Sequence, residues 1–264
     1  MELGLKDKLA LVSGSTAGIG FAIAKGLAAE GARVIVNGRT EERVAAACEQ
    51  IRKEHPAARL ERFAADLSQA VAAEALAGRF PDLQILVNNL GTFEPKPFEQ
   101  IQDTDWLAMI ETNFMSGVRL SRLFLPRMKA TGWGRILFIS SESAVNIPAE
   151  MIHYGVTKTM QVALARGLAE TTKGTQVTVN SILPGPTASE GVETFVKDLA
   201  RAQQTTATQV EKQFFQTMRP SSLIQRFASP DEVAALTVFV ASPRASAING
   251  AALRVDGGVI RSIL

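Results

Sequence analysis

The chain has 264 residues, enough for one large α/β domain, and 46% of them are hydrophobic. It carries 28 Lys and Arg against 26 Asp and Glu, a formal net charge of +2, which excludes a polyanion-binding protein that depends on a broad basic field. Cys48 is the only cysteine, and His55 and His153 are the only histidines, so a disulfide framework and a cysteine-rich or multi-histidine metal site are excluded. Catalysis must use other groups, of which the scarcest is Tyr154, the only tyrosine.

The apolar run near the start of the chain is too short for a secretory signal, because Lys6, Asp7 and Lys8 interrupt it. No stretch reaches the roughly 20 apolar residues of a membrane span. We therefore expect a cytoplasmic protein with neither a membrane nor a nucleic-acid partner.

Short apolar runs typical of strands alternate with longer segments of helical periodicity. The predicted strands cover residues 9–12, 34–36, 60–64, 85–87, 135–139, 176–183 and 251–255. The predicted helices cover residues 19–30, a segment capped by Thr40, a segment from Ser68, and residues 106–129, 151–173 and 230–241. This order predicts an α/β fold in which helices cover both faces of a parallel sheet of about seven strands, with residues 1–264 forming a single domain.

Residues 186–228, here named the edge segment, break the alternation. They contain a polar, helix-compatible run over residues 197–216 with no strand after it. A long excursion at the edge of a compact domain is more often functional than idle, so we expect a substrate lid. Phe195, Phe214 and Phe215 either line an apolar cleft there or pack the lid onto the body or a neighbouring subunit.

A glycine-rich turn, Ser13-Gly14-Ser15-Thr16-Ala17-Gly18-Ile19-Gly20, joins the first predicted strand to the first predicted helix. Glycines there allow a pyrophosphate to approach backbone N–H groups at a helix N-terminus, where negative charge is favoured. The spacing differs from the general G-x-G-x-x-G fingerprint and lacks the Gly-Lys-Ser/Thr of a P-loop, which disfavours a nucleotide triphosphatase. The turn indicates a cofactor site, with an ordinary strand-to-helix connection as the alternative.

Tyr154 and Lys158 project from one face of a predicted helix. An ammonium beside a tyrosine favours the phenolate, whose usual pKa is about 10, so the pair is a candidate general acid/base. A buried tyrosine beside an exposed lysine is the alternative. Ser141, at the end of the fifth predicted strand, can donate to a substrate oxygen and stabilise charge there, with Ser140 as its competitor. No His–carboxylate pair is suggested by order or spacing, which disfavours a serine hydrolase.

Together with the glycine turn, Asn88-Asn89-Leu90-Gly91, Ser141, Tyr154-x3-Lys158 and Pro184-Gly185-Pro186-Thr187 resemble, in order, the motifs of the short-chain dehydrogenase/reductase family over nearly the whole chain. Ser13 stands where that family usually has threonine, and Leu90 where it has alanine. The resemblance selects Ser141 over Ser140. It implies a Rossmann-type, doubly wound fold and hydride transfer between a nicotinamide cofactor and a carbonyl or secondary alcohol.

The resemblance also implies individual roles. Tyr154 passes a proton to or from the substrate oxygen, Ser141 polarises that oxygen, and Lys158 lowers the tyrosine pKa and binds the nicotinamide ribose. Asn113 completes the catalytic tetrad by holding a water that links the lysine to solvent. The expected cofactor-binding residues are Gly14, Ser15, Thr16, Gly18, Ile19, Gly20, Arg39, Asp66, Leu67, Asn89, Gly91, Tyr154, Lys158, Pro184, Gly185 and Thr187, and no metal is expected.

Two of these cofactor residues have specific expected partners. Asp66 resembles the family's adenine-contacting aspartate, although capping of the next helix by Asp66 or Ser68 accounts for it equally well. Thr187 lies where the family can hydrogen-bond the nicotinamide carboxamide.

Gly38 occupies the position at which an acidic residue would bind the ribose hydroxyls of NAD, and Arg39 follows it. Because an arginine can pair with the extra phosphate of NADP, we expect NADP(H), with NAD(H) less favoured. The alternative is that Arg39 pairs with Glu41 or Glu42 in a solvated loop.

Substrate choice is expected to lie in residues 188–218, helped by Phe93, Asn146, Ile147 and Met151. A 3-oxoacyl thioester reductase and a sugar, steroid or small-ketone dehydrogenase are all possible within the family. A noncatalytic NADP(H) sensor is an alternative of a different class. The apolar stretch 250–264 resembles the family's subunit-contact end and implies a homotetramer, or second a dimer, unless it is simply the last core strand.

Overall fold

The computed structural model describes residues 2–202 and 204–263, apart from the side chains of Glu190, Glu193 and Phe195. Seven strands in these residues form one parallel sheet in the order β3-β2-β1-β4-β5-β6-β7, which confirms the predicted sheet. The strands are β1 (Leu9–Val12), β2 (Arg33–Gly38), β3 (Arg59–Ala64), β4 (Ile85–Asn88), β5 (Gly134–Ile139), β6 (Val177–Pro184) and β7 (Ala252–Val255). The strand order reverses between β1 and β4, where doubly wound sheets open a crevice for ligands.

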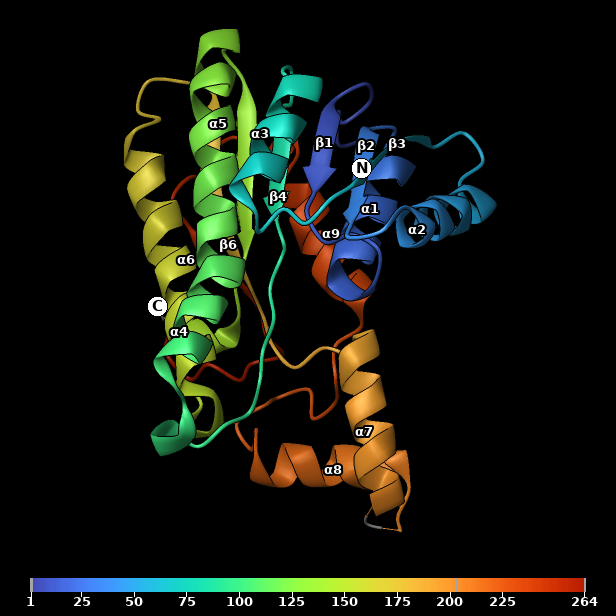
Figure 1. The fold of residues 1–264 in the computed structure, drawn as a ribbon, viewed down its shortest axis with the longest axis vertical. Helices are drawn as coiled ribbons and strands as arrows, with labels where there is room; N and C mark the ends of the chain where they lie inside the picture. The colour runs from blue at the N-terminus through green and yellow to red at the C-terminus, as the bar shows by residue number, and fades with distance from the viewer. Residues whose placement is uncertain (1, 203, 264) are drawn as a thin grey trace.

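Helices cover both faces of this sheet (Figure 1). One apolar core lies between the sheet and α1 (Gly18–Ala29), α2 (Glu41–Glu54) and α9 (Pro230–Val240). The other lies between the sheet and α3 (Ala70–Arg79), α5 (Ser116–Thr131) and α6 (Ile152–Glu170). Because both faces are covered, β1, β4, β5 and β6 are buried along their whole length, including Arg135 on β5 and Asn180 on β6.

The long helix predicted over residues 106–129 is instead two helices. α4 (Asp103–Ile110) and α5 are joined by a π-helical turn, Glu111–Met115, with Asn113 at its centre. Such turns occur mostly as single insertions in α-helices and often at functional sites. The apolar periodicity does not reveal the turn, because helical backbone continues on both sides of it.

The edge segment contains two helices, α7 (Glu190–Ala202) and α8 (Ala207–Thr217), where one run was predicted over residues 197–216. They lie beyond the end of the sheet to which β1 points in Figure 1. The division falls before α8, where the Thr206 hydroxyl accepts a hydrogen bond from Gln209 N and caps the new helix. Thr187 and Ala228 form a parallel bridge, so the two ends of the segment are joined to each other.

Phe214, Phe215 and Phe227 pack against one another with ring centroids 5.1 Å apart. Phe215 is 1% exposed. For Phe214 and Phe215, the sequence left open whether they line an apolar cleft or pack against another part of the protein. The structure favours packing, and Phe227, against which both rings pack, lies in the edge segment itself. Phe195, the third phenylalanine considered, has its side chain outside the described residues.

The remaining boundaries differ little from the predicted ones. Thr40 caps α2 as predicted, with its side chain accepting from Arg43 N.

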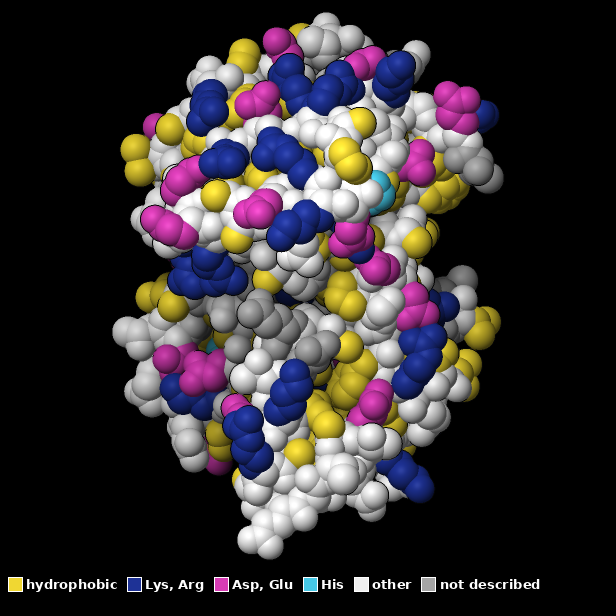
Figure 2. Space-filling model, turned by 90° about the vertical axis from the view of Figure 1, so that its right-hand side faces the viewer, with side chains coloured by type: hydrophobic (Ala, Val, Ile, Leu, Met, Phe, Trp, Pro, Cys, Tyr) yellow, Lys and Arg dark blue, Asp and Glu magenta, His cyan; other side chains and the backbone are white. Residues whose placement is uncertain are grey.

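Within the described residues, no helix is both long and apolar enough to cross a membrane. Figure 2 shows basic and acidic side chains interspersed over one face, in keeping with a net charge of +2. Short 3-10 turns lie at Phe98–Gln100, Glu142–Ala144, Ala149–Met151 and Pro243–Ala245.

Candidate active site

The carboxyl ends of five neighbouring strands carry most of the site residues predicted from the sequence. Parallel strands end at the same edge of a sheet, so residues far apart in the chain meet there. The glycine turn follows β1, Arg39 follows β2, Asn89 and Gly91 follow β4, Ser141 follows β5, and Gly185 follows β6. Asp66 and Leu67 follow β3, farther along the same edge.

The glycine turn leaves room for a ligand to approach its backbone. Gly14 and Gly18 have φ values of 62° and 55°, in the left-handed region that favours glycine. A Cβ on Gly20 would lie 2.4 Å from the Asn89 amide nitrogen and 2.4 Å from Gly14 O. No side chain caps the N-terminus of α1, so its first N–H groups are not taken by a capping oxygen. The turn therefore fits the phosphates of a dinucleotide.

Asn37 ties this turn to its neighbours, a role that the sequence analysis missed. Its Oδ1 accepts from Gly14 N at 3.0 Å, and its Nδ2 donates to Phe63 O and Ala65 O, both at 3.0 Å. The side chain is 1% exposed, so these bonds satisfy an amide that would otherwise be buried at a cost. An asparagine at the end of an otherwise apolar strand, Arg33–Gly38, was the available signal.

Ser13 and Asn89 join the glycine turn to the turn after β4. The Ser13 hydroxyl oxygen accepts from Asn89 N and from Leu90 N, both at 3.0 Å. Asn89 Nδ2 donates in return to Ser13 O at 2.9 Å and to Gly14 O at 3.1 Å. The serine at the family's threonine position thus uses its hydroxyl to hold the two turns together.

At the end of β2, the position of Gly38 is closed to any larger residue. A Cβ there would lie 2.5 Å from the Thr16 methyl carbon. Arg39 is exposed, and among the described residues it forms no ion pair; Glu41 pairs with Arg62 at 3.2 Å instead. The guanidinium of Arg39 is therefore available to an anion beside the glycine turn.

Asp66 does not cap the next helix. The helix α3 begins at Ala70, its N-cap residue is Gln69, and no side chain caps it, so the capping alternative for Asp66 and Ser68 is wrong. Asp66 Oδ1 instead accepts from Ser68 N at 3.0 Å, and the carboxylate is exposed. Leu67 is fully buried, so its side chain belongs to the core.

Ser141 lies close enough to Tyr154 to affect the pKa of its phenol. Burial raises the pKa of Tyr154 to about 12, whereas the hydrogen bond from Ser141 acts to lower it. The Ser141 oxygen accepts from Ser143 N at 3.1 Å, which leaves its proton for donation. Ser140 donates to the main-chain oxygen of Lys158 at 2.8 Å, so the competing serine is committed to the backbone.

Lys158 lies beneath this pair with its ammonium 5.6 Å from the centroid of the Tyr154 ring. The residue is 5% exposed, unlike the solvated lysine of the alternative interpretation. Its Nζ donates to Ile139 O at 2.9 Å. Burial lowers the pKa of Lys158 to about 8, so the ammonium is still the main form at neutral pH.

Asn113 uses its side chain to hold the chain after β4. Its Oδ1 accepts from Thr92 N at 2.8 Å and its Nδ2 donates to Thr92 O at 2.9 Å. The same Nδ2 donates to Thr157 Oγ1 on α6 at 3.1 Å. The main-chain oxygen of Asn113 accepts a hydrogen bond from the carboxamide of Gln161.

The turn after β6 begins the edge segment. A Cβ on Gly185 would lie 2.5 Å from Asp256 O, so the two backbones approach closely there. Thr187 is 6% exposed, and its hydroxyl donates to Gly185 O at 2.9 Å. The Ser189 Cβ lies 3.3 Å from the Cβ position of Gly18, so the edge segment starts against the glycine turn.

Arg219, at the other end of the edge segment, forms an ion pair that the sequence analysis did not find. Its Nε donates to Glu142 at 2.9 Å and its Nη1 donates to Glu150 at 3.1 Å. Arg219 is 8% exposed and Glu142 is 3% exposed. Burial acts to lower the pKa of Arg219, but the attraction and hydrogen bonds of Glu142 and Glu150 together outweigh it and leave the pKa raised. Because Glu142 follows Ser141, the pair ties the edge segment to the chain beside Ser141.

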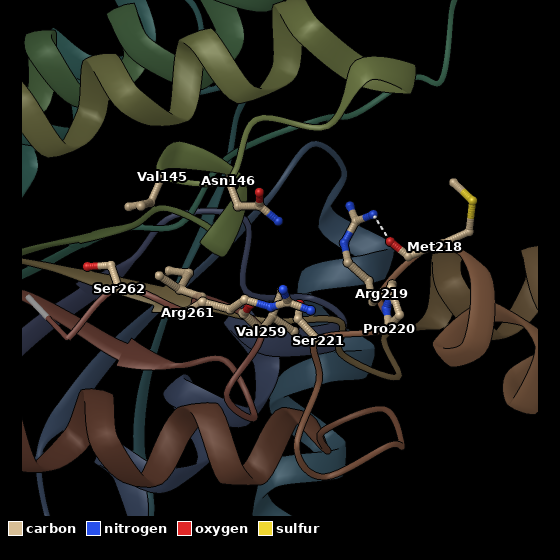
Figure 3. A pocket seen from close by; sticks show the side chains of 10 residues that line it. Val145, Asn146, Met218, Arg219, Pro220, Ser221, Val259, Arg261 and Ser262 are labelled. Atoms are coloured by element: carbon tan, nitrogen blue, oxygen red, sulfur yellow. Dashed lines mark hydrogen bonds between the residues drawn. The ribbon is translucent and has the colours of Figure 1, made fainter.

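A pocket of about 420 Å³ adjoins this ion pair. Figure 3 shows Val145 and Asn146 on one wall and Arg219 with Met218 on another, while Val259, Arg261 and Ser262 come from the C-terminal end of the chain. Asn146 was among the residues expected to help select a substrate. The pocket therefore brings together Asn146 and Met218, two of the residues expected to take part in substrate choice.

The model of the short chain dehydrogenase family matches residues 8–200. The chain belongs to the short-chain dehydrogenase/reductase family. It is 48% identical to another member, the uncharacterized oxidoreductase YvaG of Bacillus subtilis, over 100% of both chains.

Solved structures of family members give the same fold. L-sorbose reductase from Gluconobacter frateurii, complexed with NADPH and L-sorbose, superimposes with a TM-score of 0.93 at 30% identity over 100% of both chains. A 7α-hydroxysteroid dehydrogenase complexed with NADH superimposes with a TM-score of 0.85 at 28% identity, over 100% of this chain and 98% of the other. The family thus includes relatives of this fold with each nicotinamide cofactor.

We predict that Arg219→Met destabilises the protein by about 3–5 kcal/mol, because it leaves the Glu142 carboxylate buried without its partner. The free energy of unfolding in urea measures the loss. Arg226→Met is the matched control, since Arg226 pairs with Glu232 in the same region but on the surface, with side chains 52% and 43% exposed. Equal losses of unfolding free energy in the two variants would show that the buried Arg219–Glu142 pair contributes no more to stability than the exposed Arg226–Glu232 pair.

Proposed function

We propose that the protein transfers hydride between NADP(H) and a carbonyl or secondary alcohol. The observation that carries the proposal is the buried Lys158 ammonium 5.6 Å from the centroid of the Tyr154 ring, with Ser141 close enough to affect the tyrosine pKa. A nicotinamide bound at the sheet edge would supply or accept the hydride. The chain's own residues then handle the substrate oxygen and its proton.

In the reductive direction, Ser141 donates to the carbonyl oxygen and stabilises the charge that develops on it. Tyr154 gives its proton to the same oxygen, and the Lys158 ammonium stabilises the phenolate that remains. With a pKa of about 12, Tyr154 carries this proton at neutral pH and acts as an acid. Oxidation of an alcohol requires the phenolate instead, so the protonated Tyr154 suits the reductive step at neutral pH.

The cofactor proposal rests on the end of β2. Gly38 leaves no room for an acidic side chain, and Arg39 is exposed without an ion pair among the described residues. Both features suit the additional phosphate of NADP(H). The NADPH complex of the similar L-sorbose reductase supports this choice, and NAD(H) is the alternative.

Assembly as a homotetramer, or second as a dimer, is also a proposal. In the C-terminal stretch, Val259 and Ile260 are buried within the chain itself, whereas Ile263 is 94% exposed. Leu223 is 83% exposed and lies against Gly258. Exposed apolar side chains at this end suit a contact with another subunit.

Tyr154→Phe is expected to lower kcat/KM for carbonyl reduction by about 10²–10⁴-fold, because it removes the general acid and keeps the ring. The dissociation constant of NADPH, measured by fluorescence titration, should stay within about twofold, since one neutral hydrogen bond contributes little net affinity. Unchanged reduction in this variant would refute the mechanism.

Arg39→Ala is expected to weaken NADPH binding by about 10–100-fold, the usual worth of hydrogen bonds to a charged group, and to leave NADH binding unchanged. Parallel titrations with both cofactors measure the two effects. Arg43→Ala, which removes an exposed arginine from the first turn of α2, is the control and should change neither. Equal affinity of the unaltered protein for NADPH and NADH would defeat the phosphate-pairing argument.

A further inference from the structure

A buried carboxamide connects the lysine of the proposed site to the π-helical turn. Gln161 lies on α6, three residues after Lys158, and is 1% exposed. Its Oε1 accepts from Lys158 Nζ at 3.4 Å, and its Nε2 donates to the main-chain oxygen of Asn113. The bond to Asn113 joins two elements that are far apart in the sequence, since Asn113 and Gln161 are 48 residues apart.

The orientation of this carboxamide is determined by its partners. An ammonium offers donors alone, so the amide oxygen must face Lys158. A carbonyl offers an acceptor alone, so the amide nitrogen must face Asn113. The reverse orientation would set donor against donor and acceptor against acceptor, and the side chain is therefore held in one position.

The ammonium depends on such neutral acceptors. Burial is the cause of the lowered pKa of Lys158, and no carboxylate among the described residues offsets it. The acceptors on its Nζ are Ile139 O on β5 and Gln161 Oε1 on α6. Tyr154, whose ring centroid lies 5.6 Å from Nζ, is the titratable group that faces it from its own helix. Each acceptor therefore contributes to keeping the charge in place.

We propose that Gln161 is a positioning residue that links the Lys158 ammonium to the Asn113 carbonyl and so keeps its charge beside Tyr154. This role rests on the proposed function of Lys158. The side-chain amide makes directly the connection that the family resemblance assigns to a water molecule. A carboxamide holds its partners at fixed positions, whereas a water molecule can leave the site.

The pKa of Lys158 tests this proposal directly. Lysine labelled with carbon-13 at its ε position can be titrated by NMR, and Lys158→Met identifies the signal. Gln161→Glu places a carboxylate beside the ammonium and should raise the pKa of Lys158 by about one unit or more. Gln161→Met keeps a side chain of similar length without an acceptor and should lower the pKa by about one unit.

The pH profile of carbonyl reduction gives a second readout. The ammonium must be charged, so kcat falls as the pH rises through the pKa of Lys158. That alkaline fall should move to lower pH in Gln161→Met and to higher pH in Gln161→Glu. Gln209→Glu, the same change at an exposed position of α8, is the matched control and should move neither the titration nor the profile.

The outcomes separate the two proposals. An unchanged Lys158 pKa in Gln161→Met overturns the positioning role, and this variant alone decides the matter if Gln161→Glu does not fold. Shifts of the Lys158 pKa in opposite directions in Gln161→Met and Gln161→Glu support the positioning role even if the protein turns over no substrate. If the unaltered protein binds NADPH and reduces no carbonyl, the proposed function fails while the titration still reports on Gln161.

Discussion

The site depends on one positive charge that the fold keeps inside the protein with no carboxylate partner among the residues that the structure describes. Taking an ammonium out of water is costly, and the Lys158 charge persists because main-chain and amide oxygens surround it. In such a low-dielectric environment the charge acts more strongly on Tyr154 than it would in water. The end of β5, the helix α6 and the π-helical turn at Asn113 must therefore all keep their positions for the charge to stay beside Tyr154.

The two sides of the site are built by different means. On the candidate cofactor side, Asn37, Ser13 and Asn89 join the turn after β1 to the ends of β2 and β3 and to the turn after β4 through hydrogen bonds to backbone atoms. These bonds give a rigid cradle whose shape hardly depends on side-chain charge. On the substrate side, the edge segment is attached by the bridge between Thr187 and Ala228 and by the ion pair of Arg219 with Glu142. The edge segment is therefore attached to the sheet edge by a backbone bridge and a buried ion pair.

The fold and the order of the motifs were predictable because both follow from local patterns. Apolar runs gave the strands, and parallel pairing brings their carboxyl ends together. The missed features come from contacts between distant residues. Arg219 and Glu142 are 77 residues apart, and Gln161 meets Asn113 across 48. The π-helical turn is hidden because its residues continue the helical pattern. The Asn37 amide was visible in the sequence, but its three partners lie on two other elements.

The most direct test of the central claim is to assay a panel of carbonyl compounds, covering sugars, steroids, small ketones and 3-oxoacyl thioesters, with NADPH and with NADH. The loss of reduced nicotinamide absorbance and the alcohol formed are measured together. The account predicts that at least one carbonyl is reduced with NADPH in preference to NADH, with one alcohol formed per NADPH consumed. Tight binding of NADPH with no reduction of any compound by either cofactor would contradict it and would indicate a noncatalytic sensor.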